Sequence, residues 1–101
     1  MPSDLEELQN RFALLTGHLI ILIEAQAMLV SGKSVSDIIS WLGSVSAAAN
    51  KETTPIAEGK RYAVSYLLAN TDRGNLRKTI AKKILEIAED RLRCAHELGI
   101  R

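Results

Sequence analysis

The stretch from Phe12 to Val30 most constrains what this chain can fold into. It reads FALLTGHLIILIEAQAMLV, and Glu24 is its one fully charged residue. A helix with apolar side chains in almost every direction has to be covered on more than one side. One apolar seam repeats at alternating spacings of three and four, interrupted at Gln26, which is typical of a contact with a partner helix: Leu5, Leu8, Phe12, Leu15, Leu19, Leu22 and Leu29.

A second apolar stripe begins at Ala13 and lies on another side of the same helix. The pattern predicts a helix of about 28 residues, which is roughly 42 Å long and exceeds the width of a 100-residue globule. Two stripes on one long helix favour a packed core on one side and a contact with a second copy on the other. We therefore predict a homodimer or small homo-oligomer, with this interface: Leu14, Ile20, Ile21 and Met28.

Boundary residues predict four helices, at about 4–31, 35–50, 55–69 and 75–98. Ser3 with Glu6, and Ser34 with Asp37, have the spacing of capping boxes. The sequence also predicts Gly32 as a C-terminal cap. It predicts two further N-caps, Thr54, with Pro55 at the first helical position, and Asn75. The 101 residues are 47% hydrophobic but only 4% aromatic. This composition favours one all-α domain, an antiparallel four-helix bundle with a long N-terminal helix.

Charge and cysteine content bear on location. The net charge of +1 gives no global field for nucleic acid or a membrane. Cys94 is the one cysteine, so we expect a core thiol in a reducing cytoplasm. Acidic residues at 4, 6 and 7 argue against a signal peptide, and the run from Phe12 to Ile23 is shorter than the about 20 residues of a membrane span. We expect a soluble protein of bacterial or phage type without a membrane partner.

Charge is divided unevenly along the chain. Residues 1–59 hold three basic and seven acidic residues, and residues 60–101 hold ten basic and five acidic ones. Basic side chains near the start of the last helix oppose the helix dipole. They suit an acidic or phosphate-bearing partner, or they form a solvated surface that pairs with the acidic half. With two tyrosines, the predicted partner-binding cluster is Lys60, Arg61, Tyr62, Tyr66, Arg73, Arg77, Lys78, Lys82 and Lys83.

Residues 38–51 read IISWLGSVSAAANK and resemble the helix-turn-helix pattern of bacterial transcription regulators. The resemblance implies a turn at Gly43 followed by a recognition helix in the major groove of DNA. The residues that would face the bases are Ser46, Ala47, Asn50 and Lys51. One continuous amphipathic helix is the alternative.

The triplet Trp41-Leu42-Gly43 near the middle of the chain resembles the motif of the secreted WXG100 helical-hairpin proteins. The resemblance implies that the triplet lies at the turn between two long helices.

Two charged residues lie on apolar stripes, Glu24 and Arg91. Because buried charges are rarely left unpaired, we predict that each is paired, with the other or with another group, either inside the bundle or across a subunit boundary. His18 is expected in the core or an interface. Two histidines and one cysteine without ligand spacing predict no metal site, and no phosphate loop or nucleophile elbow is present in the sequence.

The sequence therefore predicts a non-enzymatic helical interaction module without a cofactor. It would self-associate through its first helix and dock on a larger protein as an adaptor, inhibitor or regulatory subunit. A small DNA-binding regulator is the first alternative, and a WXG100-like secreted protein is the second. Nucleic acid is the less favoured partner.

Overall fold

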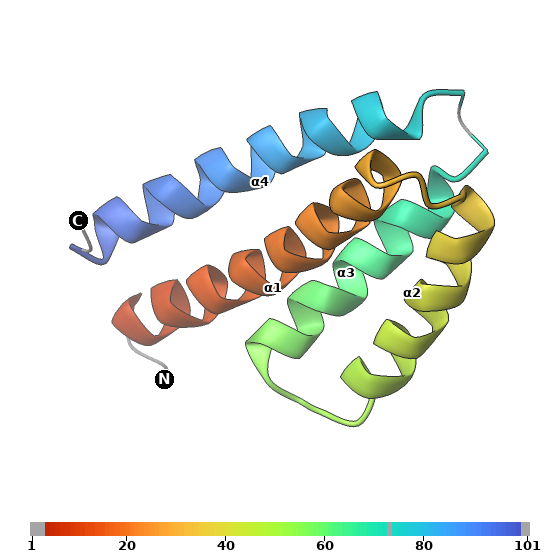
Figure 1. Cartoon of the computed structure of the whole chain (residues 1–101). Coiled ribbons are helices and arrows are strands. Elements are labelled where there is room, and N and C mark those ends of the chain that lie inside the picture. Colours follow the sequence, from red (N-terminus) through yellow and green to blue (C-terminus); the bar gives the residue numbers. More distant parts are fainter. Residues whose placement is uncertain (1–3, 73, 100–101) are drawn as a thin grey trace.

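The computed structural model describes residues 4–72 and 74–99. These residues form four helices: α1 (Asp4–Val30), α2 (Val35–Ala49), α3 (Pro55–Ala69) and α4 (Leu76–Glu97). Consecutive helices reverse direction along the chain (Figure 1). The prediction of an all-helical fold with four helices is confirmed, and each helix begins and ends within one residue of its predicted bounds.

Local capping sets these boundaries. Ser34 and Asp37 form the predicted capping box, with Ser34 N donating to Asp37 Oδ2 at 3.0 Å and Asp37 N donating to Ser34 Oγ at 3.1 Å. The other two predicted N-caps also accept a bond from the backbone N–H three residues later: Thr54 and Asn75. Gly32 follows α1 with φ of +95°, a conformation that glycine adopts without strain. Ser3, from the first predicted capping box, lies outside the described residues.

Helix α1 is the centre of the fold. Both α3 and α4 pack along α1, whereas α2 packs mainly on α3. The helices therefore follow the spatial order α4, α1, α3, α2, as Figure 1 shows. The main neighbours of α1 are thus not the next helix in the chain but the two after it.

The contact between α1 and α3 is a direct approach of two backbones. A Cβ atom on Gly59 would lie 1.9 Å from the carbonyl oxygen of Leu14, and one on Gly17 would lie 2.1 Å from the carbonyl oxygen of Ile56. No side chain fits at either position, so only glycine permits this approach. The pair of glycines therefore fixes where α3 meets α1.

The contact between α1 and α4 is made by side chains. The Cys94 thiol donates to the carbonyl oxygen of Leu8 at 3.3 Å. Farther along, Arg91 Nε donates to Thr16 Oγ1 at 2.9 Å, and the Arg91 guanidinium lies over the Phe12 ring at 4.4 Å from its centroid. The leucine seam predicted for α1 thus meets a helix of its own chain, although Leu5 at its start is exposed.

One apolar core joins all four helices. Its fully buried large side chains come from each of them: Leu22, Ile38, Leu42, Leu67 and Ile80. Each such side chain contributes roughly 1.5–3 kcal/mol by leaving water. The core holds the four helices together as one packed unit.

Candidate interaction surfaces

An apolar stripe on the second half of α1 remains open to solvent. Ile20, Ile23 and Val30 are 38%, 49% and 61% exposed, and Ala27 between them is exposed as well. Their spacings of three, four and three place all four side chains on one face of the helix. We call these four residues the α1 stripe. It is an apolar part of α1 that the described residues of the chain leave uncovered.

The predicted interface on α1 lay on a different side of the helix. Ile21 is only 3% exposed and belongs to the core, so its assignment to a subunit interface is wrong. Leu14 and Met28 are half-buried, and only Ile20 reaches the open face. The reason is that Leu14, Ile21 and Met28 repeat at intervals of seven, on the side where Gly17 brings α1 against α3.

By length and composition alone, α1 could cross a membrane. Its most apolar 18-residue window has a mean hydropathy of 1.8, and 33% of that window is buried inside the fold. The expectation that the apolar run is too short is therefore wrong, because the run continues beyond Glu24. The central helix of a packed domain has the same properties.

A hollow of about 210 Å³ lies where α1, α2 and α3 meet. Five apolar and three charged residues line it: Ile20, Ile21, Val45, Ala48 and Ala49, with Glu24, Glu52 and Lys60. Glu24 is exposed there, so it is not a buried charge. Arg91 is half-buried and bonds to Thr16, and within the described residues of this one chain it forms no ion pair with Glu24. Pairing of Glu24 across a subunit boundary stays a prediction.

The predicted basic cluster divides into two groups. At the start of α3, Arg61 Nη1 donates to the carbonyl oxygens of Ala49 at 2.6 Å and of Glu52 at 3.1 Å. These bonds tie the end of α2 to α3, so Arg61 has a structural role. Lys60 lines the hollow described above. Arg73 lies outside the described residues.

The second group is at the start of α4. Arg77, Lys78 and Lys82 are exposed there, and we call them the basic ridge. Lys83 behaves differently, because its Nζ lies 4.9 Å from the centroid of the Tyr66 ring and 3.3 Å from Glu86 Oε2. The structure thus brings together Tyr66 and Lys83, which the sequence analysis had placed in one cluster.

Tyr62 stands apart from the basic ridge, on the exposed side of α3. Its hydroxyl donates to Glu58 Oε1 at 3.1 Å. This hydrogen bond, together with the negative charge of Glu58, raises the pKa of the Tyr62 hydroxyl. The Tyr62 hydroxyl thus bonds within α3, whereas the Tyr66 ring, one turn later, contacts Lys83 of α4.

His18 is buried on α1, as expected for a core histidine. Burial lowers its pKa, and the positive charge of Lys83 lowers it further. Its Nε2 atom is buried without a hydrogen-bond partner. Both the burial and the nearby charge thus disfavour the protonated imidazole.

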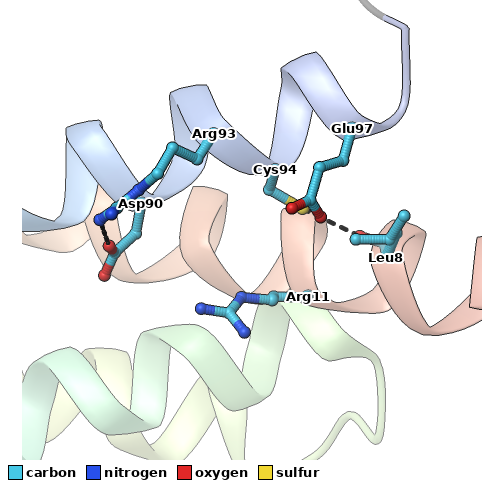
Figure 2. Close-up of a pocket in the computed structure, with 6 residues that line it drawn as sticks. All are labelled: Leu8, Arg11, Asp90, Arg93, Cys94 and Glu97. Atoms are coloured by element: carbon cyan, nitrogen blue, oxygen red, sulfur yellow. Dashed lines mark hydrogen bonds and ion pairs between the residues drawn. The ribbon is translucent and has the colours of Figure 1, made fainter.

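A pocket of about 290 Å³ lies between the start of α1 and the end of α4. Two arginines, two acids and two residues of the core edge line it (Figure 2): Leu8, Arg11, Asp90, Arg93, Cys94 and Glu97. Arg93 donates to Asp90 along α4, and the thiol of Cys94 is directed at α1 in Figure 2. Cys94 is buried, which confirms the predicted core thiol. The opposite charges balance, so the pocket selects neither anions nor cations.

Helix α2 is continuous from Val35 to Ala49. Gly43 lies inside it, so the turn that both the helix-turn-helix and the WXG100 resemblances require is not there. Of the predicted DNA-contacting residues, Ser46 and Ala47 lie in the same helix, and Asn50 is its C-cap, with Nδ2 donating to Ser46 Oγ at 3.5 Å. Lys51 follows in the exposed connection to α3. These residues do not form a separate recognition helix.

Comparison with protein-family models, with curated proteins and with solved structures found no match. Within residues 4–72 and 74–99, no group of three or more His, Cys, Asp or Glu side chains is placed to hold a metal ion.

Proposed function

We propose that the protein is a non-enzymatic helical interaction module that self-associates and docks on a larger protein. In this proposal its helices act as an antiparallel bundle in the cytoplasm of a bacterial or phage-infected cell, and the module forms a homodimer. The observation that carries the proposal is the α1 stripe, with three large apolar side chains left open on the longest helix. Apolar surface of this kind on a small domain is typical of an interaction site.

The basic ridge supports docking on an acidic protein surface. The first turn of α4 contains no acidic residue, and Arg77 and Lys78 stand there at the positive end of the helix dipole. Helix stability does not favour this placement. An acidic partner does, because charges of opposite sign across an interface speed association and select the partner.

Charge reversal on the ridge tests the docking proposal. The variant Arg77→Glu, Lys78→Glu and a control variant, Lys33→Glu, Lys51→Glu, each change two exposed residues. Both are used for affinity capture from an extract of the native organism, beside the unaltered chain. We expect one acidic protein to bind the unaltered chain and the control, to be lost with the ridge variant, and to be released by salt.

Two results would contradict this proposal. Capture of the same proteins by the ridge variant would remove the ridge from the docking surface. Binding of the unaltered chain to duplex DNA at low salt, with steep loss as salt rises, would assign the ridge to phosphates instead.

A further inference from the structure

A second apolar strip lies on the outer side of α4, away from the core. Leu85 and Leu92 are 65% and 58% exposed, whereas Ile80 and Ile87 on the same helix are buried. Ala81 beside the two leucines is exposed and Ala88 is half-buried. Together these residues have spacings of four, three and four, which is the heptad pattern of a helix-to-helix seam: Ala81, Leu85, Ala88 and Leu92.

Large and small residues alternate along this strip. If a second α4 lies antiparallel on the first, a single register places each leucine against an alanine. Leu85 then meets the second copy's Ala88, and Ala81 meets the second copy's Leu92. One register allows both contacts, because the midpoint between residues 85 and 88 is also the midpoint between residues 81 and 92. Such large-to-small layers interdigitate without voids. A parallel pair would instead set leucine against leucine and leave a gap between the alanines.

The charges that flank the strip fit the same register. Lys82 follows Ala81 and Glu89 follows Ala88, so the two occupy equivalent heptad positions on one edge of the strip. Both are exposed. In the antiparallel register Lys82 lies beside the second copy's Glu89, and Glu89 beside its Lys82. The strip is therefore complementary to itself in size and in charge.

The α1 stripe continues this surface. Arg91 bonds to Thr16, and Gln26 Nε2 donates to the backbone carbonyl of Arg77 at 3.0 Å. Ile20 and Ile23 lie between these two contacts and on the same side of α1 as Thr16. Of the two, Ile20 lines the hollow formed with α2 and α3, whereas Ile23 lies on the Gln26 side of α1 and is therefore the residue nearer to α4 and to a helix packed on the strip.

We infer that a second copy of this chain packs antiparallel on the outer strip of α4, about a two-fold axis between Leu85 and Ala88. This inference rests on the self-association part of the proposed function. It places the centre of the dimer interface on α4 instead of α1. The contact is isologous, so it closes at two copies and leaves no open end for further assembly.

The mass of the chain in solution tests the inference. Sedimentation equilibrium should give a dimer for the unaltered chain and a monomer for Leu85→Lys, Leu92→Lys. The control Leu68→Lys changes an exposed leucine of α3 and should remain dimeric. Circular dichroism should give the same helix content for all three, because the altered side chains are exposed.

Charge exchange tests the register. Lys82→Glu places like charges together twice in the dimer, so we expect the dissociation constant to rise roughly tenfold. Adding Glu89→Lys restores both pairs and should restore the dissociation constant.

Disulfide trapping separates antiparallel from parallel pairing. In a Cys94→Ala background, Leu85→Cys chains mixed with Ala88→Cys chains should form a mixed disulfide under mild oxidation. Neither variant alone should do so, because residue 85 does not meet its own counterpart in the antiparallel register. Disulfides in the separate variants would overturn the inference in favour of a parallel pair.

Three further outcomes would overturn it. A dimer that persists in Leu85→Lys, Leu92→Lys but dissociates on Ile20→Lys, Ile23→Lys would keep the proposed self-association and reject the α4 strip. A monomer at every concentration would reject both. A monomer that sediments with vesicles of phosphatidylcholine and phosphatidylglycerol would assign the strip to a lipid surface.

Discussion

The two helices that pack on α1 do so in different ways. At the crossing with α3, backbone meets backbone, and Gly17 and Gly59 are the residues that permit it. Along α4, side chains interdigitate and polar bonds such as Arg91 to Thr16 lie at the edge. A backbone contact cannot adjust to an added atom, whereas a layer of side chains can shift. The first contact should therefore be intolerant of substitution and the second tolerant.

The largest effect should come from Gly59→Ala. Alanine normally stabilises a helix interior, but here its Cβ would overlap the Leu14 carbonyl group. We expect a loss of about 3 kcal/mol in the free energy of unfolding, measured by urea denaturation. Gly17→Ala should behave alike. A loss below about 1 kcal/mol would mean that the two helices separate easily and that the contrast with α4 is not real.

A moderate effect is expected at the edge of the α4 contact. Arg91→Met keeps the apolar length of the side chain but removes the bond to Thr16 and the charge over the Phe12 ring. We expect a loss of about 1 kcal/mol in the same denaturation experiment. The matched variant Arg93→Met, at an exposed position, should change the free energy of unfolding much less. Equal losses in the two variants would contradict a specific role for Arg91.

A pH dependence should come from His18, which lies at the meeting of α1 with Lys83 of α4. The pKa of His18 is lowered in the folded chain from its ordinary value of 6.5, so the unfolded chain binds the proton more readily. The stabilisation that depends on neutral His18 should therefore be fully present above pH 6.5. The free energy of unfolding should fall as the pH drops below 6.5 and through the lower pKa of the folded chain. His18→Gln should reduce this dependence, whereas His96→Gln, at an exposed site, should leave it unchanged.

The smallest effect is expected at Gly43, in the interior of α2. A Cβ atom there would meet no atom within 4 Å. Gly43→Ala should therefore raise the free energy of unfolding by about 0.5 kcal/mol, since alanine loses less backbone entropy in a helix. The same glycine-to-alanine substitution should lower the free energy of unfolding at Gly59 and raise it at Gly43. A lower free energy of unfolding for Gly43→Ala would contradict the gain expected from helix propensity.

Helix boundaries could be predicted from the sequence because capping is local. Ser34, Thr54 and Asn75 each bond to the residue three positions later, so the relevant partners are adjacent in the sequence. The covered side of α1 could not be predicted in this way. It depends on Gly17 meeting residue 56, and the only local indication was a glycine among large apolar residues.

The candidate surfaces were predictable only in part. The basic residues of α4 could be grouped from the sequence because they share one helix. Arg61 could not, because it bonds to the carbonyl oxygen of Ala49 at the end of α2, across the loop that joins α2 to α3. The outer strip of α4 was present in the spacing of Leu85 and Leu92. It became visible only when the structure showed that Ile80 and Ile87, not these leucines, enter the core.

The spatial order of the helices has a consequence for how quickly the chain folds. Its decisive contacts join distant residues, with Gly17 against Ile56 and Leu8 against Cys94. Ordering such long chain segments before their contacts form slows the search for the native state. We therefore expect this small helical protein to fold more slowly than helical domains whose successive helices pair as hairpins.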